Sequence, residues 1–255
     1  MSLRVIALAV LTLYVADLSA QDALVHESRV QVPQHGDEQW EYRIENAGTS
    51  PIIAFRVELQ CSGNHTYEHT EDSLVSYGSQ QQKPIAPGST RSFPFPDWAV
   101  PCSTKSDTGV IFANGTTAGS SANVDCLLAR RKGAYDALQF VKPKIDAVAA
   151  GKLDAATVAA SFHSEIQQSN HDSTLGAEVW SGRVGVLSIA ALVLESQQDF
   201  LVPSDLQPNR PPGIEEVMAN ENISHERAQA TVVSRKLAEW IRDLKNDPSF
   251  AKLNP

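Results

Sequence analysis

The chain has 255 residues, of which 42% are hydrophobic and 20% are charged. This composition is that of a globular protein with enough material for one large domain or two modest ones, and it excludes a chain that is disordered throughout. The net charge of -9 and the pI of about 5.2 argue against electrostatic binding of nucleic acid, which needs a concentrated basic surface.

The first twenty residues predict a secretory signal peptide. Arg4 forms a basic start, an apolar stretch follows, and Ala20 supplies the small residue of a cleavage site. The apolar stretch is too short to span a membrane, and the second apolar run, residues 190–194, is bracketed too closely by Arg183 and Glu195. We therefore expect a mature chain that is exported, either secreted or periplasmic, and that has no membrane span.

Alternating apolar and polar residues predict β-strands between residues 21 and 120. The clearest run covers residues 53–61, and residues 40–45 show the same two-residue period. Residues 62–71 are polar and predict a loop. Pro94 lies within an aromatic run and cannot donate to a strand ladder, which indicates an edge strand. About seven short strands with frequent turns predict an antiparallel β-sandwich.

The stretch Gly109 to Ser120, GVIFANGTTAGS, separates this half of the chain from a helical half. Residues 110–112 predict a strand, and Asn114-Gly115 predicts a two-residue hairpin turn because both residue types tolerate positive φ. A short return strand follows, and a serine hydroxyl is free to cap the next helix. The chain is therefore expected to leave the sheet near residue 120.

Helical spacing of apolar residues predicts α-helices from residue 121 to residue 255. The first helix carries Arg130-Arg131-Lys132 on its outer side, and Pro143 breaks or kinks it. Asp154 predicts the N-cap of a second helix. The segment 175–200 is the most apolar and is expected at the centre of the helical layer, and a last helix is expected over about 224–245.

Three cysteines fit an oxidising compartment, but their spacing matches no zinc motif. Cys61 and Cys102 both belong to the β half, so we expect a disulfide between them and a buried thiol at Cys126. Spacing alone does not fix the connectivity, and the other pairings stay open.

Several of these motifs together resemble a set of uncharacterised secreted bacterial proteins. The shared features are Cys61 closing a long alternating strand, the turn Ala86-Pro87-Gly88, the run VIFANGT and a helix bearing LLARRKGAYDAL. The likeness covers roughly the first two-thirds of the mature chain. It implies an α+β fold with an N-terminal immunoglobulin-like antiparallel β-sandwich at residues 21–120, followed by an α-helical region at residues 121–255. It implies no activity.

The sharpest chemical candidate is the segment His65-Thr66-Tyr67-Glu68-His69, which matches the H-x-x-E-H pattern of zinc hydrolases. That mechanism needs both histidines one helical turn apart on Zn²⁺, with the glutamate acting as base on the metal-bound water. Here the segment follows a strand and a turn, and no later helix offers an obvious third ligand. A solvated loop is the preferred interpretation, and His65, Glu68 and His69 remain candidate metal ligands.

The other candidate polar sites have simpler explanations. His163 and His171 share a helix face only if the helix continues past Asn170, so surface histidines at a helix end are preferred. Gly182 and Gly185 lack the spacing of a phosphate loop and predict close helix packing. The sequence contains no G-x-S-x-G nucleophile elbow.

Aromatic residues could form a binding surface. Phe93, Phe95 and Trp98 lie among prolines near the expected sheet edge, where exposed rings could stack on a glycan or contact a peptide. Buried rings would simply be core, which is the commoner outcome for large aromatic side chains.

The leading functional hypothesis is an exported, non-catalytic binding or structural module with no catalytic residue and no cofactor. It would act through a β-strand edge or an aromatic surface, and its partner would be an envelope protein or a glycan. The alternative is a metal-dependent hydrolase that uses His65, Glu68 and His69. The ligand and the oligomeric state stay open.

Overall fold

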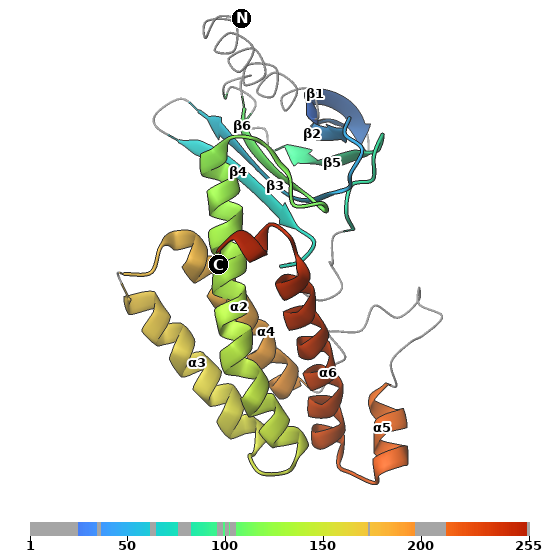
Figure 1. Ribbon diagram of the computed structural model, residues 1–255, viewed down its shortest axis with the longest axis vertical. Coiled ribbons are helices and arrows are strands. Elements are labelled where there is room, and N and C mark those ends of the chain that lie inside the picture. The colour runs from blue at the N-terminus through green and yellow to red at the C-terminus, as the bar shows by residue number, and fades with distance from the viewer. Residues whose placement is uncertain are drawn as a thin grey trace, which may run out of the picture. The chain divides into compact units, whose positions relative to one another are not determined.

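The structure is a computed structural model and describes residues 25–34, 37–61, 65–75, 83–95, 99, 102, 106–172, 174–196 and 213–253 (Figure 1). The predicted signal peptide and Trp98 lie outside these residues. Strands come first and helices follow, so the predicted α+β class is confirmed. The chain divides into two compact units, Met1–Asp72 with Lys83–Asp125, and Ser73–Gln82 with Cys126–Pro255.

The first unit holds two antiparallel sheets. One has the order β1-β2-β5, with β1 at Val25–Gln34, β2 at Asp37–Asn46 and β5 at Thr90–Phe95. The other has the order β4-β3-β6-β7, with β4 at Thr66–Asp72, β3 at Ile52–Gln60, β6 at Asp107–Phe112 and β7 at Thr117–Gly119. The predicted alternating strands 40–45 and 53–61 therefore correspond to β2 and β3.

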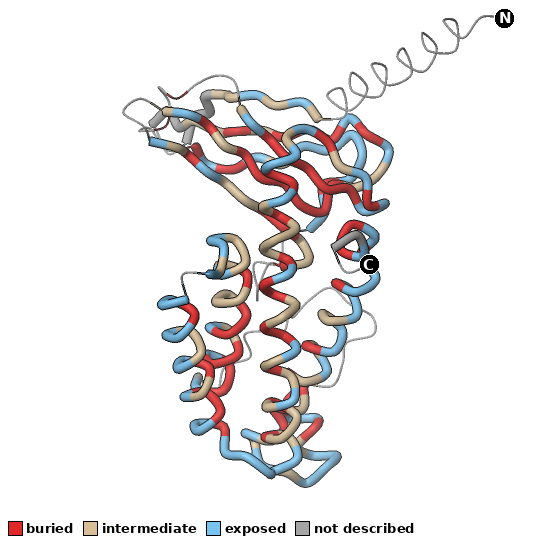
Figure 2. The backbone as a smooth tube through the Cα atoms, turned by 60° about the vertical axis from the view of Figure 1, so that its left-hand side comes forward, coloured by how far each residue is buried: buried red, intermediate tan, exposed pale blue. Residues whose placement is uncertain are grey.

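Both sheets contribute to one hydrophobic core. The rings of Phe55 and Phe93 stack between the sheets with their centroids 5.9 Å apart, and Tyr67 meets Phe95 edge to face at 5.0 Å. Buried positions recur along the strands of both sheets (Figure 2). Because each aromatic side chain removes a large apolar area from water, these rings are the main attachment between the two layers.

The turn between β6 and β7 has three residues where the sequence predicted two. Phe112 N–H donates to Thr116 O and Gly115 N–H donates to Phe112 O, both at 2.9 Å. Gly115 has φ of +79°, whereas Asn114 does not have a positive φ. A three-residue hairpin loop needs the left-handed conformation only at its last position, so glycine alone supplies it.

Two glycines let the chain leave the sheet at Ser120, where the sequence predicted it. A Cβ atom at Gly109 would lie 2.7 Å from the backbone nitrogen of Val124, in the first turn of α2 (Ser121–Ala149). Gly119 has φ of +75°, and a Cβ atom there would lie 1.9 Å from Thr108 O. The helix can therefore start directly against β6 only because neither position carries a side chain.

The second unit is built from helices. They are α2, α3 (Ala155–His171), α4 (Ala177–Ser196), α5 (Ile214–Glu221), α6 (His225–Asn246) and the short 3₁₀ helix η4 (Phe250–Leu253). Pro143 lies inside α2, so the helix does not break there, and the kink predicted as the alternative stays a prediction. Val141 and Ile145 beside it are fully buried, and their packing outweighs the hydrogen bond that proline removes. Asp154 caps α3 as predicted, accepting from Thr157 N–H at 2.7 Å.

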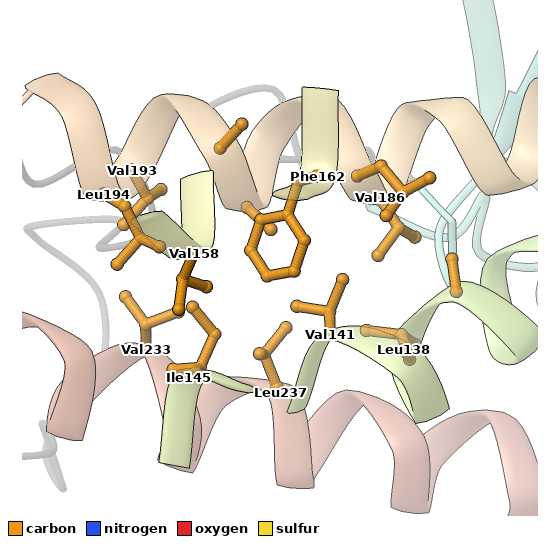
Figure 3. Packing of buried hydrophobic residues seen from close by; sticks show 14 of the residues in the cluster. Leu138, Val141, Ile145, Val158, Phe162, Val186, Val193, Leu194, Val233 and Leu237 are labelled. Carbon is orange, nitrogen blue, oxygen red and sulfur yellow. The ribbon is translucent and has the colours of Figure 1, made fainter. Parts of the chain in front are cut away.

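Phe162 of α3 lies in the middle of the helical core (Figure 3). The labelled side chains around it come from four helices: Leu138, Val141, Ile145, Val158, Val186, Val193, Leu194, Val233 and Leu237. Gly133 and Gly182 bring the backbones of α2 and α4 together, because a Cβ atom at either would lie 1.9 Å from a carbonyl oxygen of the other helix. The close packing predicted for Gly182 is therefore observed.

Within the part of the chain that the structure describes, α4 holds one segment, Ala177–Glu195, long and apolar enough to cross a membrane by length and composition alone. Here that helix packs against α2 and α3, and 39% of the segment is buried.

Arg131 contradicts the expectation of an exposed basic run. Its side chain is fully buried, with Nη1 donating to Asp247 Oδ1 at 3.1 Å and to Ser249 Oγ at 2.9 Å. Asp247 also accepts from the backbone N–H groups of Ser249 and Phe250. The buried charge therefore anchors the segment between α6 and η4 onto α2.

Candidate functional site

The segment predicted as a polar loop forms the edge strand β4, so that prediction is wrong. Its seven residues pair continuously with β3, from Thr66 opposite Gln60 to Asp72 opposite Ala54. The two-residue period was hidden because the inward positions include His69 and Glu71 as well as Tyr67. The strand conformation is decided by pairing with β3, a tertiary contact that outweighs the local sequence preference.

The strand conformation does not form the zinc arrangement that H-x-x-E-H requires. Four residues of strand separate His65 and His69 by about 13 Å, and Glu68 points to the opposite face of the sheet. Among the described residues, no group of three or more His, Cys, Asp or Glu side chains could hold a metal ion. The structure therefore does not bring His65, Glu68 and His69 together as metal ligands.

His69 instead has a place in the packing of the two sheets. Its ring stacks on Phe93 of β5 with centroids 3.7 Å apart, and Nε2 lies 3.2 Å from Glu71 Oε1. The other oxygen of Glu71 lies 3.5 Å from Arg91 Nη1. This chain of contacts joins β4 to β5, so the histidine serves to attach one sheet to the other.

Glu68 is bound to a buried cation, Arg56, which occupies a polar position in the alternating run 53–61. Arg56 of β3 is nearly buried, and its Nη2 lies 2.9 Å from Glu68 Oε2. Arg56 Nε also donates to Asn123 Oδ1 at 3.1 Å, and Asn123 Nδ2 donates to Asp107 O at 2.7 Å. The guanidinium therefore fixes the Glu68 carboxylate on the outer face of the sheet.

Phe93 and Phe95 do not form the candidate binding surface. Their exposed fractions are 4% and 3%, and both rings belong to the shared core of the two sheets. Arg29 lies over the ring of Phe95, with Cζ 4.9 Å from the centroid. The third member, Trp98, lies outside the described residues. Because Phe93 and Phe95 are buried, they give no support to an aromatic binding surface.

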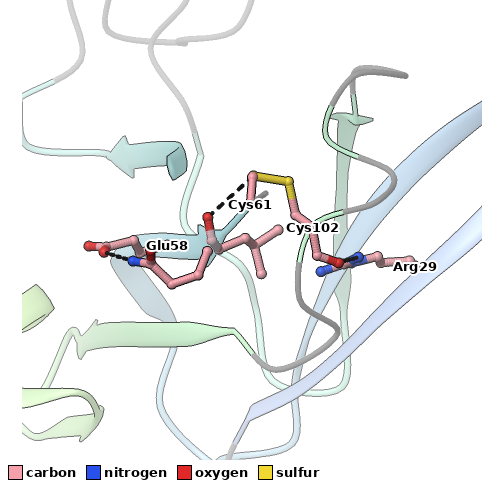
Figure 4. The surroundings of a disulfide bond; sticks show 6 residues. Arg29, Glu58, Cys61 and Cys102 are labelled. Atoms are coloured by element: carbon pink, nitrogen blue, oxygen red, sulfur yellow. Dashed lines mark hydrogen bonds between the residues drawn. A yellow bond between two sulfur atoms is a disulfide. The ribbon is translucent and has the colours of Figure 1, made fainter. Parts of the chain in front are cut away.

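Cys61 and Cys102 are joined by a disulfide (Figure 4). Cys61 follows the end of β3, and Cys102 lies in the connection between β5 and β6. Arg29 Nη1 donates to the carbonyl oxygen of Cys102 at 3.2 Å, which holds the same connection against β1. Cys126 is in no disulfide and is partly exposed.

Hydrogen bonding fixes which backbone groups of β4 face outward. Cys61 N–H donates to His65 O at 2.8 Å, so residues 61 and 65 form a hydrogen-bonded pair. Such pairs alternate along an antiparallel ladder, so Tyr67 and His69 also face β3. The N–H and C=O groups of Thr66, Glu68 and Thr70 therefore point away from β3. In the described sheet β4 is outermost, and nothing there pairs with that side (Figure 1).

The other described sheet edges carry features that hinder pairing with another strand. β7 has only three residues. In β5, the bond from Asn46 N–H to Ser89 O sets the alternation so that Pro94 faces the free edge without a donor, as its sequence context predicted. In β1, Glu27 and Arg29 point inward, an arrangement that protects edges from indiscriminate pairing. β4 also directs a charge inward at Glu71, which pairs with His69 and Arg91, but it has seven residues and no proline.

The inward charges of β1 are held by hydrogen bonds within the first unit. Glu27 accepts hydrogen bonds from the Tyr42 hydroxyl and the Ser106 hydroxyl. Burial raises the pKa of Tyr42 above its usual range, and the bond to the Glu27 carboxylate raises it further. These groups therefore stabilise the fold and are not offered to a ligand.

The helical candidates do not form a shared polar site. α3 continues through His171, so His163 and His171 lie on one helix, but His163 Nε2 bonds to Glu195 Oε1 at 2.8 Å. Glu165 pairs with Arg183. Both histidines are exposed, which matches surface residues.

Comparison of the chain with protein-family models, with curated proteins and with solved structures gives no match. These comparisons therefore identify no family behind the resemblance to secreted bacterial proteins.

Proposed function

We propose that the chain is an exported, non-catalytic binding module that takes an extended segment of a partner protein as an additional strand beside β4. One observation carries the proposal: β4 is a seven-residue edge strand that has no proline and directs the backbone groups of Thr66, Glu68 and Thr70 outward. An extended peptide satisfies such groups with main-chain hydrogen bonds, which is the basis of strand addition. An envelope protein fits this mode better than a glycan, because Phe93 and Phe95 are buried.

The finer fold assignment belongs to the same proposal. A three-stranded sheet of order β1-β2-β5 facing a four-stranded sheet of order β4-β3-β6-β7 supports an immunoglobulin-like sandwich. In such a sandwich, β4 would be the edge strand beside the central β3. The hydrolase alternative has less support, because the strand geometry of β4 separates His65, Glu68 and His69.

The change Thr70→Pro tests the proposal. Proline removes the outward N–H of residue 70 and costs no hydrogen bond to β3, because that pair bonds through residues 69 and 71. We expect loss of partner capture from envelope and secreted fractions of the source organism, with the melting temperature little changed. The matched control, Thr70→Val, keeps the N–H and the side-chain shape, so it should capture the partner as the wild type does.

Amide exchange measured by NMR tests the edge itself before any partner is known. In the free chain the N–H groups of Tyr67 and His69 should exchange slowly, and those of Glu68 and Thr70 should exchange fast. Slow exchange at all four positions would show that another segment already covers β4, and the proposal would fail. Equal capture by Thr70→Pro and Thr70→Val would also contradict it.

A further inference from the structure

We infer that the β4 edge selects an extended peptide with lysine or arginine at the position facing Glu68. This inference rests on the proposed strand addition and adds the chemistry that sets its specificity. It starts from a like-charge pair: Glu58 of β3 and Glu68 of β4 lie directly opposite each other in the ladder. Like charges in that position destabilise a sheet unless a cation lies nearby.

The described residues place one cation, Arg56, beside this pair. Arg56 lies on the same face and contacts Glu68, with Nη2 2.9 Å from Oε2. Glu58 accepts from Gln60 Nε2 at 3.0 Å, a neutral donor. Among the described residues, Arg56 is thus the cation beside these two carboxylates, in a chain whose net charge is already -9.

A basic residue in a strand added beyond β4 would bring a further positive charge next to Glu68. Neighbouring strands lie about 4.8 Å apart, and directly opposite side chains stand on the same face of the sheet. A residue that pairs with Glu68 in an added strand would therefore stand beside its carboxylate, which is half exposed, with 49% of the side chain accessible. The flanking outward positions are Thr66 and Thr70, whose short side chains leave room for β-branched neighbours.

The partner segment is thus an extended peptide with one basic residue between β-forming residues at alternate positions. Arg56 helps by holding the Glu68 carboxylate in place, so that an incoming lysine or arginine meets a charge that is already oriented. Attraction between a basic segment and the acidic chain would also speed their encounter and weaken with added salt.

Selection from a phage-displayed library of random linear nonapeptides tests this inference on the full mature chain. The wild type should enrich peptides with lysine or arginine at one fixed position, flanked two residues away by Val, Ile or Thr. Against Glu68→Lys the enriched position should change to aspartate or glutamate. For a selected peptide, Glu68→Gln should weaken binding by a factor of roughly 1.4 to 5, the range of one cross-strand charge pair. Glu58→Gln is the matched control and should weaken it less, because its carboxylate lies one strand further from the peptide.

The variants distinguish failure of the specificity inference from failure of strand addition. If enriched peptides are lost on Thr70→Pro but show no basic preference and no change with Glu68→Lys, the specificity inference is overturned and strand addition stands. If Thr70→Pro binds the selected peptides as Thr70→Val does, or if no peptide is enriched, strand addition fails and the specificity inference fails with it. Glu68→Gln keeps the test valid should Glu68→Lys fold poorly beside Arg56.

Discussion

A single substitution changes the free energy of unfolding most where it removes a buried charge, and Arg131 is the clearest example. Its guanidinium is fully buried and pairs with Asp247, whose side chain is only 5% exposed. Removing one member of a buried pair leaves the other charge uncompensated, which costs about 3–5 kcal/mol. We expect Arg131→Met to lower the free energy of unfolding by that amount, as measured by urea denaturation.

The adjacent residue provides the control for this prediction. Lys132 also pairs with an aspartate, with Nζ 2.8 Å from Asp136 Oδ2, but both side chains are more than 40% exposed. Exposed pairs one helical turn apart stabilise by at most about 0.5 kcal/mol, so Lys132→Met should change stability little. Equal effects of the two substitutions would show that burial of Arg131 does not matter to the fold.

Arg131 also shows why some residues were misplaced from the sequence. Three consecutive basic residues normally indicate a solvated helix face, and nothing near Arg131 in sequence names its partner, which follows 116 residues later. The same limit applies to Arg56, which occupies a polar position in the alternating run 53–61 but bonds to Asn123, 67 residues away. Burial of a charged side chain depends on partners that are distant in sequence, and the local residue pattern gives no information about them.

At the scale of elements, close backbone contact between α2 and α4 yields a second stability prediction. Gly182→Ala places a methyl group 1.9 Å from Arg130 O, a backbone atom that cannot rotate away. Alanine favours a helix by about 1 kcal/mol over glycine, but overpacking at such a contact costs about 1–3 kcal/mol or more. We therefore expect a net loss of stability, seen as a lower melting temperature in circular dichroism.

Gly176 is the control for that substitution. It precedes α4, has no positive φ between +20° and +160°, and a Cβ atom there would meet nothing within 4 Å. Gly176→Ala should lower stability by no more than about 1 kcal/mol, because Gly176 is the N-cap of α4, accepting from Trp180 N–H at 2.9 Å, and alanine is less favourable than glycine there. A melting temperature that falls equally for both variants would contradict the contact between the two helices.

The elements themselves were predictable where one face is apolar and the other polar. The alternation in β3 and β2 and the stripes of α3 and α6 gave their type and approximate bounds. β4 was missed because His69 and Glu71 occupy inward positions. The candidate site was missed with it, although threonines at Thr66 and Thr70, two β-favouring residues at even spacing, were a weak signal.

At the scale of the whole molecule, the chain passes between its two compact units more often than the predicted boundary at residue 120 implies. Residues 73–75 follow β4 directly and belong with the helices. Val75 is buried in the helical core, and Trp240 Nε1 of α6 donates to Leu74 O at 2.5 Å. A short turn from the strand-rich half of the sequence thus completes a core that is otherwise made by helices.

That insertion predicts that a change after β4 destabilises the helices. Val75→Ala removes buried methyl groups from the helical core, and we expect it to lower the stability of that unit by about 1–3 kcal/mol. Hydrogen exchange should then show faster opening of buried amides in α2 and α6. Leu153→Ala is the control, because that side chain is 45% exposed and should change nothing. If Val75→Ala instead speeds exchange only in β2, β3 and β6, residues 73–75 stabilise the sheets, and a cut at residue 120 would leave a helical fragment with its core complete.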